Sequence, residues 1–578
     1  MSIVQRLTEG IVNRDLSAEG AALINKWEQT GLLEGISDDT QRNGMARLLE
    51  NQAKELLRES SSMAAGDVEG FAAVAFPLVR RVFGSLIAND LVSVQPMSLP
   101  SGLIFFLDFT FGGSFSANSG DRLANATDTS LYGGGRVGSE ITGGVLLTGE
   151  EAELGPYALN NGYSSPTGSI AAAVTLVASG TVGADGVPDT TTVGGGATAG
   201  YDVNRLLRFD PDIVSGAVFA VGTVDRADLE TGNANLEDLV ALYITSSWAA
   251  DTAQVRRLAR EDFTDADKIL VTVASLTAST TAGEIAQLGA ALNAITHIDA
   301  PLADNFDAGG ALGSVVGAAD WGLEGDAGIP EIDIKVDSVA VTAVTKKLKA
   351  KWTPELGQDL NAYHNLDAEV ELTQILSEQI ALEIDREILE DLVKLATAGV
   401  RYWSRNPGQF LDRETGAVLA DGVADFTGNV SEWYETLVET INDVSAQIHR
   451  KTLRGAANFV VCGPEVANIL EFTAGFRANV TADADRGDIG AVKVGALSKK
   501  FDVMVDPYFP RNVILVGRRG SSFLESGYVY APYVPLQTTP TIFGVEDFVP
   551  RKGVMTRYAK KMVRPDMYGL VICRGLES

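Results

Sequence analysis

Cysteine and histidine are scarce in this chain. Two cysteines, Cys462 and Cys573, stand among 578 residues, together with three histidines, His297, His364 and His449. Two cysteines cannot form a disulfide framework, which suggests a reducing compartment or indifference to redox conditions. No histidine stands in an HExxH or similar metal-ligand spacing, so each is expected to be structural or exposed. We therefore expect no metal and no cofactor.

Long apolar runs and an excess of positive charge are missing as well. No apolar run approaches the roughly 20 residues needed to cross a bilayer. The first residues, MSIVQRLTEGIVNRD, contain no long apolar segment of the kind found in secretion signals. The formal net charge of −30 argues against general binding to nucleic acid or to anionic membranes. We expect a soluble product that is made in the cytoplasm and has no membrane partner.

Signatures of catalysis are absent too. The sequence has no GxSxG elbow, no CxxC pair and no calcium-binding loop of the required spacing. The glycine-rich stretch YGGGRVGSE, residues 132–140, lacks the GK[ST] end of a phosphate-binding loop and is expected to be a flexible loop. Carboxylates are abundant, but general acid–base catalysis needs two of them in different environments across one cleft. The chain is therefore not expected to be an enzyme.

The composition is that of a large folded protein, and its charge is unevenly distributed along the chain. Hydrophobic residues make up 45% and charged residues 21%, as in globular proteins, and the length suggests several domains. Residues 101–345 contain 10 Lys and Arg against 32 Asp and Glu, a net charge of −22. Basic residues gather in two runs, Lys346, Lys347, Lys349, Lys351 and Arg557, Lys560, Lys561, Arg564. Such runs are typical of complementary surfaces on copies of one chain, although solvated faces are the usual alternative.

The N-terminal region is predicted to be helical. Within residues 1–65, apolar residues recur at helical spacing in three short amphipathic helices, and the small residues of 59–67 follow as a linker. The stretch VRRVFGSLIANDLVSVQPM, residues 79–97, places its apolar residues on one helical face and Arg80 and Arg81 on the other side. Because Pro96 cannot continue a helix, the chain is expected to become extended near Val92.

Strand patterns follow. LIFFLDFTF, residues 103–111, is rich in aromatic residues and predicts a strand. Residues 113–328 are rich in Gly, Ala, Thr and Asp, and they contain several strand patterns and one helical pattern over 281–295. The segment 332–352 alternates again, with an irregularity after Val336. A two-stranded hairpin of that length cannot bury its own faces, so we expect it to lie on another part of the assembly.

The pattern that begins at Thr353 predicts a long helix. Apolar residues from Leu372 to Leu395 step by three or four positions, and acidic residues fill the gaps. A coiled coil is the competing interpretation. Between residues 432 and 525, helix and strand patterns alternate and indicate a compact α/β unit, in which Cys462 is expected to be a small core residue. The C-terminal residues return to β structure.

Four blocks in order resemble the major capsid protein of T-even-type tailed bacteriophages. VRRVFGSLIANDLVSVQPMSLPSGLIFFLDFTFG looks like the start of the mature protein of that family. Residues 347–389 are similar to the family's long helix, with the following residues at matching places: Glu355, Leu356, Gln358, Asp359, Leu360, His364, Asp367, Ala368, Glu369, Ile384, Arg386 and Glu387. SGYVYAPYVPLQ (526–537) and MTRYA (555–559) look like its C-terminal signature.

The resemblance implies an α+β chain with the tailed-phage major capsid fold named after Hong Kong 97 phage. Its parts would be a helical N-terminal extension (1–65), an N-terminal arm (66–102), an extended β-hairpin loop (103–112 and 329–352), a large β-rich insertion domain (113–328), a peripheral domain with a spine helix (353–431), an axial domain (432–525) and a C-terminal β return (526–578). The acidic insertion domain is expected on the outside, because a wall facing packaged DNA would avoid such charge.

The resemblance also implies a function. The chain would be a structural major capsid protein that self-assembles into hexamers of an icosahedral phage head enclosing double-stranded DNA. Its partners would be copies of itself in hexameric and pentameric capsomers, a scaffold, a prohead protease, and portal and decoration proteins, with only weak inner-surface contact to packaged DNA. It would be located in the virion capsid after assembly in the host cytoplasm. The alternatives are the pentamer-forming vertex protein of the same family and a bacterial surface-layer or adhesive protein, which would need a secretion signal.

The candidate site residues are therefore contacts and cleavage points, with no catalytic, cofactor-binding or metal-binding residue among them. Contacts between subunits are expected at Arg80, Arg81, Lys346, Lys347, Lys349 and Lys351. The family's N-terminal extension is removed after a hydrophobic-x-Glu motif. Leu57-Arg58-Glu59 and Leu48-Leu49-Glu50 fit that motif, so cleavage is expected after Glu59 or Glu50.

Overall fold

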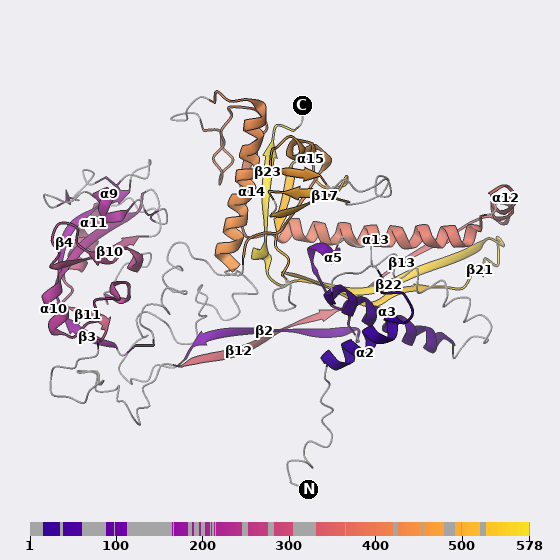
Figure 1. The fold of residues 1–578 in the computed structure, drawn as a ribbon, viewed down its shortest axis with the longest axis horizontal. Coiled ribbons are helices and arrows are strands. Elements are labelled where there is room, and N and C mark those ends of the chain that lie inside the picture. The colour runs from indigo at the N-terminus through magenta and orange to yellow at the C-terminus, as the bar shows by residue number, and fades with distance from the viewer. Residues whose placement is uncertain are drawn as a thin grey trace, which may run out of the picture. The chain divides into compact units, whose positions relative to one another are not determined.

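Two units, each with its own sheets and core, make up the computed structural model of the chain (Figure 1). Unit 1 contains Met1–Phe105 and Ser338–Ser578, and unit 2 contains Phe106–Asp337. The structure describes residues 16–34, 39–60, 88–97, 99–112, 164–165, 167–182, 188–189, 196–197, 203–208, 210, 213, 216–244, 252–275, 282–303, 331–364, 366–419, 426–452, 455–478, 492–498, 500–520 and 527–576.

The chain passes between the two units along a pair of strands. β2 (Ser101–Phe111) pairs with β12 (Ile332–Thr342), as the sequence predicts. Gly112 donates its N–H to the Glu331 carbonyl at 2.7 Å, and a Cβ at position 112 would lie 2.7 Å from that same oxygen, so only glycine fits there. The expectation of one strand over 332–352 is wrong. β12 ends at Thr342, and after Ala343, whose N–H still donates to the Pro100 carbonyl, β13 (Val344–Lys351) pairs with β22 in a different sheet.

That sheet has five strands and forms the base of unit 1. Its order is β1 (Ser93–Val94), β20 (Tyr528–Thr538), β22 (Pro550–Met562) and β13, with β21 (Ile542–Phe543) paired to β22. β13 is therefore an edge strand, antiparallel to β22 with Val344 opposite Tyr558 and Lys351 opposite Arg551. The predicted change from helix to strand before Pro96 is confirmed in the part described, where α5 (Ala88–Leu91) precedes β1.

A long helix lies on this sheet. α13 (Ala368–Leu395) buries Ile380, Ile384, Ile388 and Leu392 to 1% exposure or less, and each such side chain contributes about 1.5–3 kcal/mol when fully buried. Among the described residues, α13 lies mainly on β13 and β22, and the helix that it contacts is the adjoining α12 (Pro354–His364), so this packing is that of a helix on a sheet and not of a coiled coil. The helix does not run unbroken from Thr353 as expected. α12 ends first, and Asp367 then caps α13 by accepting the N–H of Glu369 at 2.9 Å.

Two predicted N-terminal helices complete the same core. α2 (Leu16–Glu28) and α3 (Asp39–Ser60) pack on each other, and α3 contacts β20. Trp27, Leu48 and Leu49 are buried in one cluster with residues of α13 and of the sheet. The helix expected around Val4, Leu7 and Ile11 lies outside the described residues.

A second sheet of unit 1 has seven strands. Its order is β14 (Val400–Ser404), β23 (Tyr568–Arg574), β19 (Val513–Gly517), β15 (Phe459–Cys462), β18 (Phe501–Val505), β17 (Val492–Leu497) and β16 (Phe476–Ala478). α14 (Val430–Thr452) and α15 (Pro464–Glu471) cover it and bury Trp433, Leu437, Ile441 and Val444 in its core. The compact α/β unit expected over 432–525 is present, but strands on either side of that range, β14 and β23, are also part of its sheet.

Unit 2 is built on a second seven-stranded sheet, as its strand patterns predict. Its strand order is β5 (Pro188–Asp189), β4 (Val174–Val182), β7 (Val218–Asp225), β10 (Lys268–Ser275) and β8 (Thr252–Gln254). Two short strands extend it, because β6 (Gly196–Ala197) pairs with β4 and β9 (Arg260–Glu261) pairs with β10. A separate ribbon pairs β3 (Thr167–Ala171) with β11 (His297–Pro301).

The central strands of unit 2 are buried on both faces. Successive residues of β7 alternate between two apolar clusters, Val218 and Ala220 in one, Phe219 and Val221 in the other, which explains why the strand reads as a continuous apolar run. The predicted helix over 281–295 is α11 (Ala282–Asn293), which covers the first cluster. Unit 2 also contains two shorter α-helices, α9 (Val203–Leu207) and α10 (Arg226–Thr231), and two 3-10 helices, η1 (Leu239–Ala241) and η2 (Arg256–Leu258).

Candidate functional site

A group of interlinked charged side chains lies between α13 and the five-stranded sheet. On α13, Glu383, Glu387 and Asp391 stand four residues apart, a spacing that places them on one face of a helix. The sheet opposes them with Lys346 from β13 and Lys560 from β22. Two tyrosines reach the same carboxylates from β20 and β22. We call this group the helix–sheet network.

Glu387 is the centre of the helix–sheet network. Lys346 Nζ lies 2.7 Å from its Oε2, and Lys560 Nζ lies 2.6 Å from its Oε1. The Tyr558 hydroxyl donates a third hydrogen bond to Oε2 at 2.5 Å. Three donors from two strands thus converge on one carboxylate of the helix.

The neighbouring carboxylates share the same two lysines. Glu383 Oε1 lies 2.7 Å from Lys346 Nζ, and Asp391 Oδ2 lies 2.6 Å from Lys560 Nζ. The Tyr528 hydroxyl of β20 donates to Asp391 at 2.8 Å. Each lysine therefore bridges two carboxylates one helical turn apart.

The surroundings fix the charge state of these groups. Burial opposes ionisation of Glu387, but the hydrogen bonds from Lys346, Lys560 and Tyr558 outweigh it and lower its pKa to about 2. Burial and the hydrogen bond to an ionised carboxylate both raise the pKa of Tyr528 and of Tyr558, so both phenols stay protonated donors. The pKa values of Lys346 and Lys560 are raised because the paired carboxylates outweigh the cost of burying the ammonium groups.

A second polar contact anchors the start of α13. Glu369 Oε1 lies 2.8 Å from Lys552 Nζ of β22 and accepts a hydrogen bond from the Thr541 hydroxyl at 2.7 Å. Burial raises the pKa of Glu369, but these donors outweigh it, so the pKa is lowered overall. The helix is thus held to the sheet by polar contacts at its first turn and along its second half.

The four lysines expected at subunit contacts are on opposite faces of β13. Lys346 points toward α13 with Leu348 and Ala350, which pack against the core. Lys347, Lys349 and Lys351 alternate with them, are exposed, and have no ion-pair partner among the described residues. Lys346 is thus engaged within its own chain, while the other three face outward and their contact to another subunit stays a prediction.

The other predicted site residues lie toward the N-terminus. Arg80 and Arg81 lie outside the described residues. Glu50 lies within α3, pairs with Lys26 of α2 at 2.7 Å, and follows two leucines buried to 3% exposure or less. Glu59 is the penultimate residue of α3. Cleavage after either glutamate stays a prediction.

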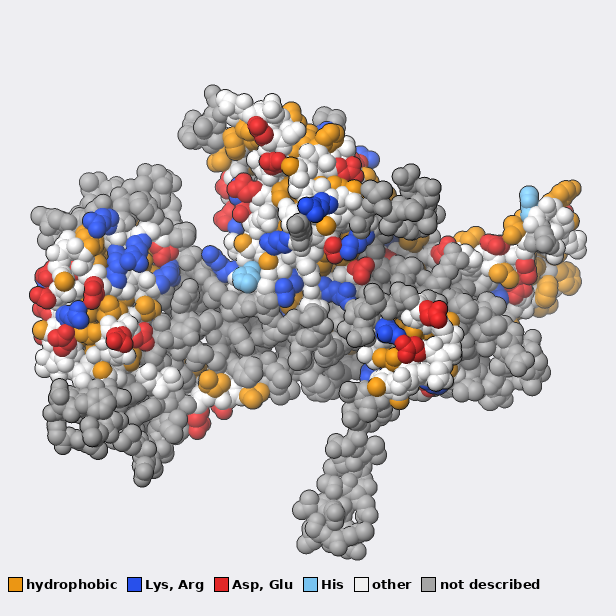
Figure 2. Space-filling model, in the orientation of Figure 1, with side chains coloured by type: hydrophobic (Ala, Val, Ile, Leu, Met, Phe, Trp, Pro, Cys, Tyr) orange, Lys and Arg blue, Asp and Glu red, His pale blue; other side chains and the backbone are white. Residues whose placement is uncertain are grey.

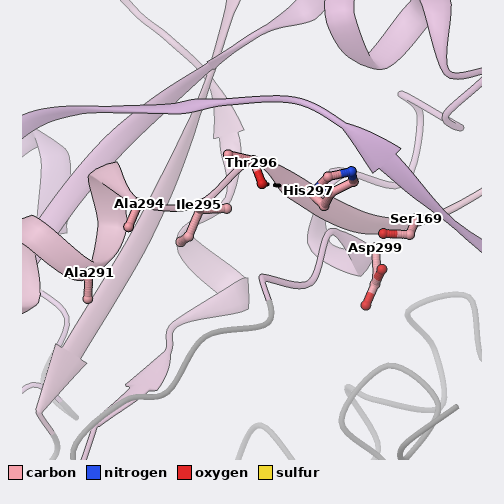
Figure 3. A pocket seen from close by; sticks show the side chains of 7 residues that line it. All are labelled: Ser169, Ala291, Ala294, Ile295, Thr296, His297 and Asp299. Carbon is pink, nitrogen blue, oxygen red and sulfur yellow. Dashed lines mark hydrogen bonds between the residues drawn. The ribbon is translucent and has the colours of Figure 1, made fainter. Parts of the chain in front are cut away.

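Unit 2 carries one polar hollow of about 230 Å³ beside the β3–β11 ribbon. Ser169, His297 and Asp299 line it, and the His297 Nδ1 lies 2.9 Å from the Thr296 hydroxyl (Figure 3). In Figure 3 the Asp299 carboxylate points away from the imidazole ring. Although serine, histidine and aspartate meet here, a nucleophilic triad needs the histidine to link the other two, and this geometry does not provide that link.

The remaining candidate residues for chemistry are structural or exposed, as expected. Cys462 and Cys573 are buried free thiols, and burial raises the pKa of each to about 12, so neither forms a reactive thiolate at neutral pH. His364 and His449 are exposed. In the part of the chain that the structure describes, no three His, Cys, Asp or Glu side chains are placed so that they could hold a metal ion, and none of the helices is long and apolar enough for a membrane crossing.

Reasoning from the sequence missed the helix–sheet network. It identified Lys346 as a member of a basic run and an expected subunit contact, Lys560 as a member of a second basic run, and Glu387 as a residue that matches a family. One available signal was the placement of tyrosines and lysines at alternate positions of β22, where Tyr558 and Lys560 share one face.

In the helix–sheet network the lysines, carboxylates and phenols are one another's partners, so its evident role is to hold α13 on the sheet. Comparison with known proteins identifies the family. The model of the family "Major capsid protein Gp23" matches residues 68–207 and 215–575, which include most of both units. The chain belongs to this family of phage major capsid proteins, and the resemblance found in the sequence is confirmed.

Several curated relatives are major capsid proteins. The chain is 31% identical over 241 residues to that of Vibrio phage KVP40, covering 39% of this chain and 45% of the relative. It is 27% identical over 332 residues to that of Escherichia phage AR1, covering 54% and 60%. It is 30% identical over 238 residues to that of Enterobacteria phage T4, covering 39% and 44%. The matched part spans about half the length of these relatives.

Solved structures give a more distant comparison. The capsid of Myoviridae phage XM1 superposes with a TM-score of 0.28 at 9% identity, covering 42% of this chain and 78% of the other. A chain from Mycobacterium phage Che8 superposes with a TM-score of 0.27 at 14% identity, covering 41% and 74%. Superposition at this level does not define a common fold, so the family assignment depends on the sequence match.

Proposed function

We propose that this chain is the major capsid protein of a T4-like phage head and that copies of it assemble into the shell of the virion. The observation that carries the proposal is the family match over residues 68–207 and 215–575, which extends through both units. A protein of this kind needs rigid bodies and complementary surfaces rather than a catalytic cleft. The helix–sheet network supplies rigidity in unit 1.

We infer further that the parts of the chain take the roles expected of the Hong Kong 97 type of capsid fold. α13 would be the spine helix of the peripheral domain, and the β2–β12 pair would be the extended hairpin that lies over a neighbouring subunit. The seven-stranded sheet with α14 and α15 would be the axial domain at the centre of a capsomer. Unit 2 would be the insertion domain.

The N-terminal helices would act during assembly. Trp27, Leu48 and Leu49 join the core of unit 1, so the extension would help to organise the subunit before a prohead protease removes it. The further partners would be a scaffold, a portal and decoration proteins, and packaged DNA would meet the inner surface only weakly. Assembly would take place in the host cytoplasm.

The test is to express the full chain alone and with assembly proteins of a related phage, then to separate the products by sedimentation and image them by electron microscopy. The proposal predicts rings of six subunits and closed shells. A variant lacking residues 106–112 and 331–337, which shortens the strands between the units, should remain folded but form no shells. Monodisperse monomers of the wild-type chain under all conditions would contradict the proposal.

A further inference from the structure

Large apolar side chains are exposed at one end of unit 1. We call this surface the apolar tip and define it by Tyr363, Val370, Ile542, Phe543, Val545 and Phe548, which are between 51% and 92% exposed. They come from α12, the first turn of α13, and β21 with the turn that follows it. Figure 2 shows hydrophobic side chains gathered at the end of unit 1 that carries α12. Exposed apolar groups in such numbers mark an interaction surface.

The backbone holds part of the apolar tip in an outward position. Phe548 has φ of +52°, in the left-handed region that a bulky residue rarely adopts. It donates its N–H to the Gly544 carbonyl at 3.0 Å, and Gly544 donates to the Val549 carbonyl at 3.0 Å. These bonds keep a tight turn with Val545 and Phe548 directed outward, at 92% and 73% exposure. A strained conformation of this kind is maintained by its surroundings and is common at binding surfaces.

The apolar tip is also fixed to the body of unit 1. Glu369, next to Val370, bonds to Thr541 just before β21 and to Lys552 of β22. Trp352 donates its N–H to the Pro550 carbonyl at 3.3 Å, which joins the start of α12 to the same strand. A surface held in this way needs little ordering when a partner binds.

The charges around the apolar tip are mainly negative. Glu355, Asp359, Glu371 and Glu546 are exposed and have no ion-pair partner among the described residues. Two cations in the same region are engaged, Arg551 with Asp547 at 2.5 Å and Lys552 with Glu369, while Lys351, opposite Arg551 on β13, is exposed beside them. Two apolar tips brought together would place these acidic rims against each other, which is unfavourable. The charge therefore favours a partner with basic groups around the contact.

The same chain presents a basic surface on β13. We call it the lysine face and define it by Lys347, Lys349 and Lys351, which are exposed on the side of the strand that points away from α13. Their alkyl stems can cover apolar groups of a partner while the ammonium groups stay in water. Alternate residues of a strand stand about 6.6 Å apart, so the lysines form an extended basic row. On an edge strand such lysines also prevent uncontrolled pairing with other strands.

We propose that the apolar tip of one copy docks on the lysine face of a second copy, with Glu371 and Glu546 facing the lysines. The proposal rests on the proposed function, because it specifies one contact of the assembly. The contact joins two different surfaces, so each copy can give and receive one, as rings and shells require. It also assigns a role to Lys347, Lys349 and Lys351 that Lys346, engaged with α13, does not share.

Cross-linking between two variants tests the contact. Phe543→Cys and Lys349→Cys chains carry different tags, and assemblies formed from their mixture are treated with a short bismaleimide. The native cysteines do not interfere because both are buried. The proposal predicts a dimer that carries both tags. The matched control replaces Phe543→Cys with Phe472→Cys. The Phe472 side chain follows α15 and is 65% exposed, and this variant should give no such dimer with Lys349→Cys.

The outcomes separate the alternatives. A dimer from Phe543→Cys chains alone would mean that tips meet each other and would overturn the proposal. Shells that give no mixed dimer would overturn it as well while leaving the proposed function intact. If the wild-type chain forms no assembly at all, the proposed function fails and the inference fails with it.

Charge reversal gives an independent test. Two double variants each reverse the charge on one side of the contact. One carries Lys347→Glu and Lys349→Glu, and the other carries Glu371→Lys and Glu546→Lys. Each should lower the yield of assemblies about tenfold, because like charges then face each other. A chain with all four changes should recover most of the wild-type yield, since the pairs are restored with opposite sign. Circular dichroism should show that each variant remains folded. If the fourfold variant does not recover the yield of assemblies although both double variants remain folded, the result would count against the contact.

Discussion

The Tyr558 hydroxyl donates a 2.5 Å hydrogen bond to the Glu387 carboxylate, although the two residues are 171 positions apart in the sequence. Lys346 and Lys560 complete the contact from two adjacent strands. One carboxylate thus joins α13 to β13 and β22. This geometry leads to several predictions on stability and assembly.

Replacement of Glu387 should destabilise unit 1. Glu387→Gln removes a charge that pairs with two partly buried lysines, each 24% exposed or less, and leaves their ammonium groups underpaired. We expect the free energy of unfolding to fall by about 2 kcal/mol, below the cost of breaking a fully buried pair because Glu387 is still 30% exposed. Urea unfolding measures this, with Glu371→Gln as the control, since Glu371 is exposed and unpaired among the described residues. Equal midpoints for the two variants would contradict a role for the network.

Stability should also depend on pH through Glu387. Its pKa is lowered to about 2 in the folded chain from an ordinary value of 4.5, so its contribution is fully present above pH 4.5 and is lost as pH falls toward 2. Unfolding midpoints measured from about pH 6 to about pH 3 should fall in the wild type and fall less steeply in Glu387→Gln. Identical slopes would mean that other carboxylates carry the acid sensitivity.

Tyr558 should contribute separately through its hydroxyl and its ring. Tyr558→Phe removes one hydrogen bond, at a cost of about 1 kcal/mol, and keeps the ring contact with Tyr530 at 5.4 Å between centroids. Tyr558→Ala also removes a buried ring and should cost about 3–5 kcal/mol. Thermal or urea unfolding of the pair separates the two effects. Equal losses for Phe and Ala would show that the ring contributes little.

Neighbouring lysines of β13 should behave differently. Lys346→Met breaks ion pairs with Glu383 and Glu387 and should lower the unfolding midpoint of the unassembled chain. Lys347→Met alters an exposed side chain and should leave that midpoint within about 0.5 kcal/mol. Assembly yield should fall in Lys347→Met although its folding is intact. The reverse assignment of effects would place the subunit contact on the other face of the strand.

Cleavage in the N-terminal extension should favour Glu59 over Glu50. A protease must extend the chain around its target, and Leu48 and Leu49 are buried while Glu50 pairs with Lys26. Glu59 lies at the end of α3, where less helix has to open. Limited digestion with a glutamate-specific protease, followed by mass spectrometry, should show the cut after Glu59 first. Lys26→Ala should speed the cut after Glu50 but not the one after Glu59.

Local patterns determined much of this protein. The apolar spacing of Leu376, Ile380 and Ile384 defines α13, and the alternation in 103–111 defines β2, because helix and strand periods are properties of the local chain. The family was also evident from short blocks of sequence, since residues that match at several ordered places leave few alternatives. The scarcity of cysteine and histidine led us to expect no metal and no cofactor.

The tertiary structure decided which side chains meet. The sequence could not show that β13 leaves β12 at Ala343 and pairs with β22, or that α12 ends at His364 before Asp367 caps α13, because both depend on hydrogen bonds to distant or neighbouring backbone groups. It could not divide four similar lysines into one that pairs with α13 and three that face outward. The division depends on which side of β13 packs against α13. That side is fixed only in the folded chain, where Lys346, Glu387 and Lys560 come together from distant parts of the sequence.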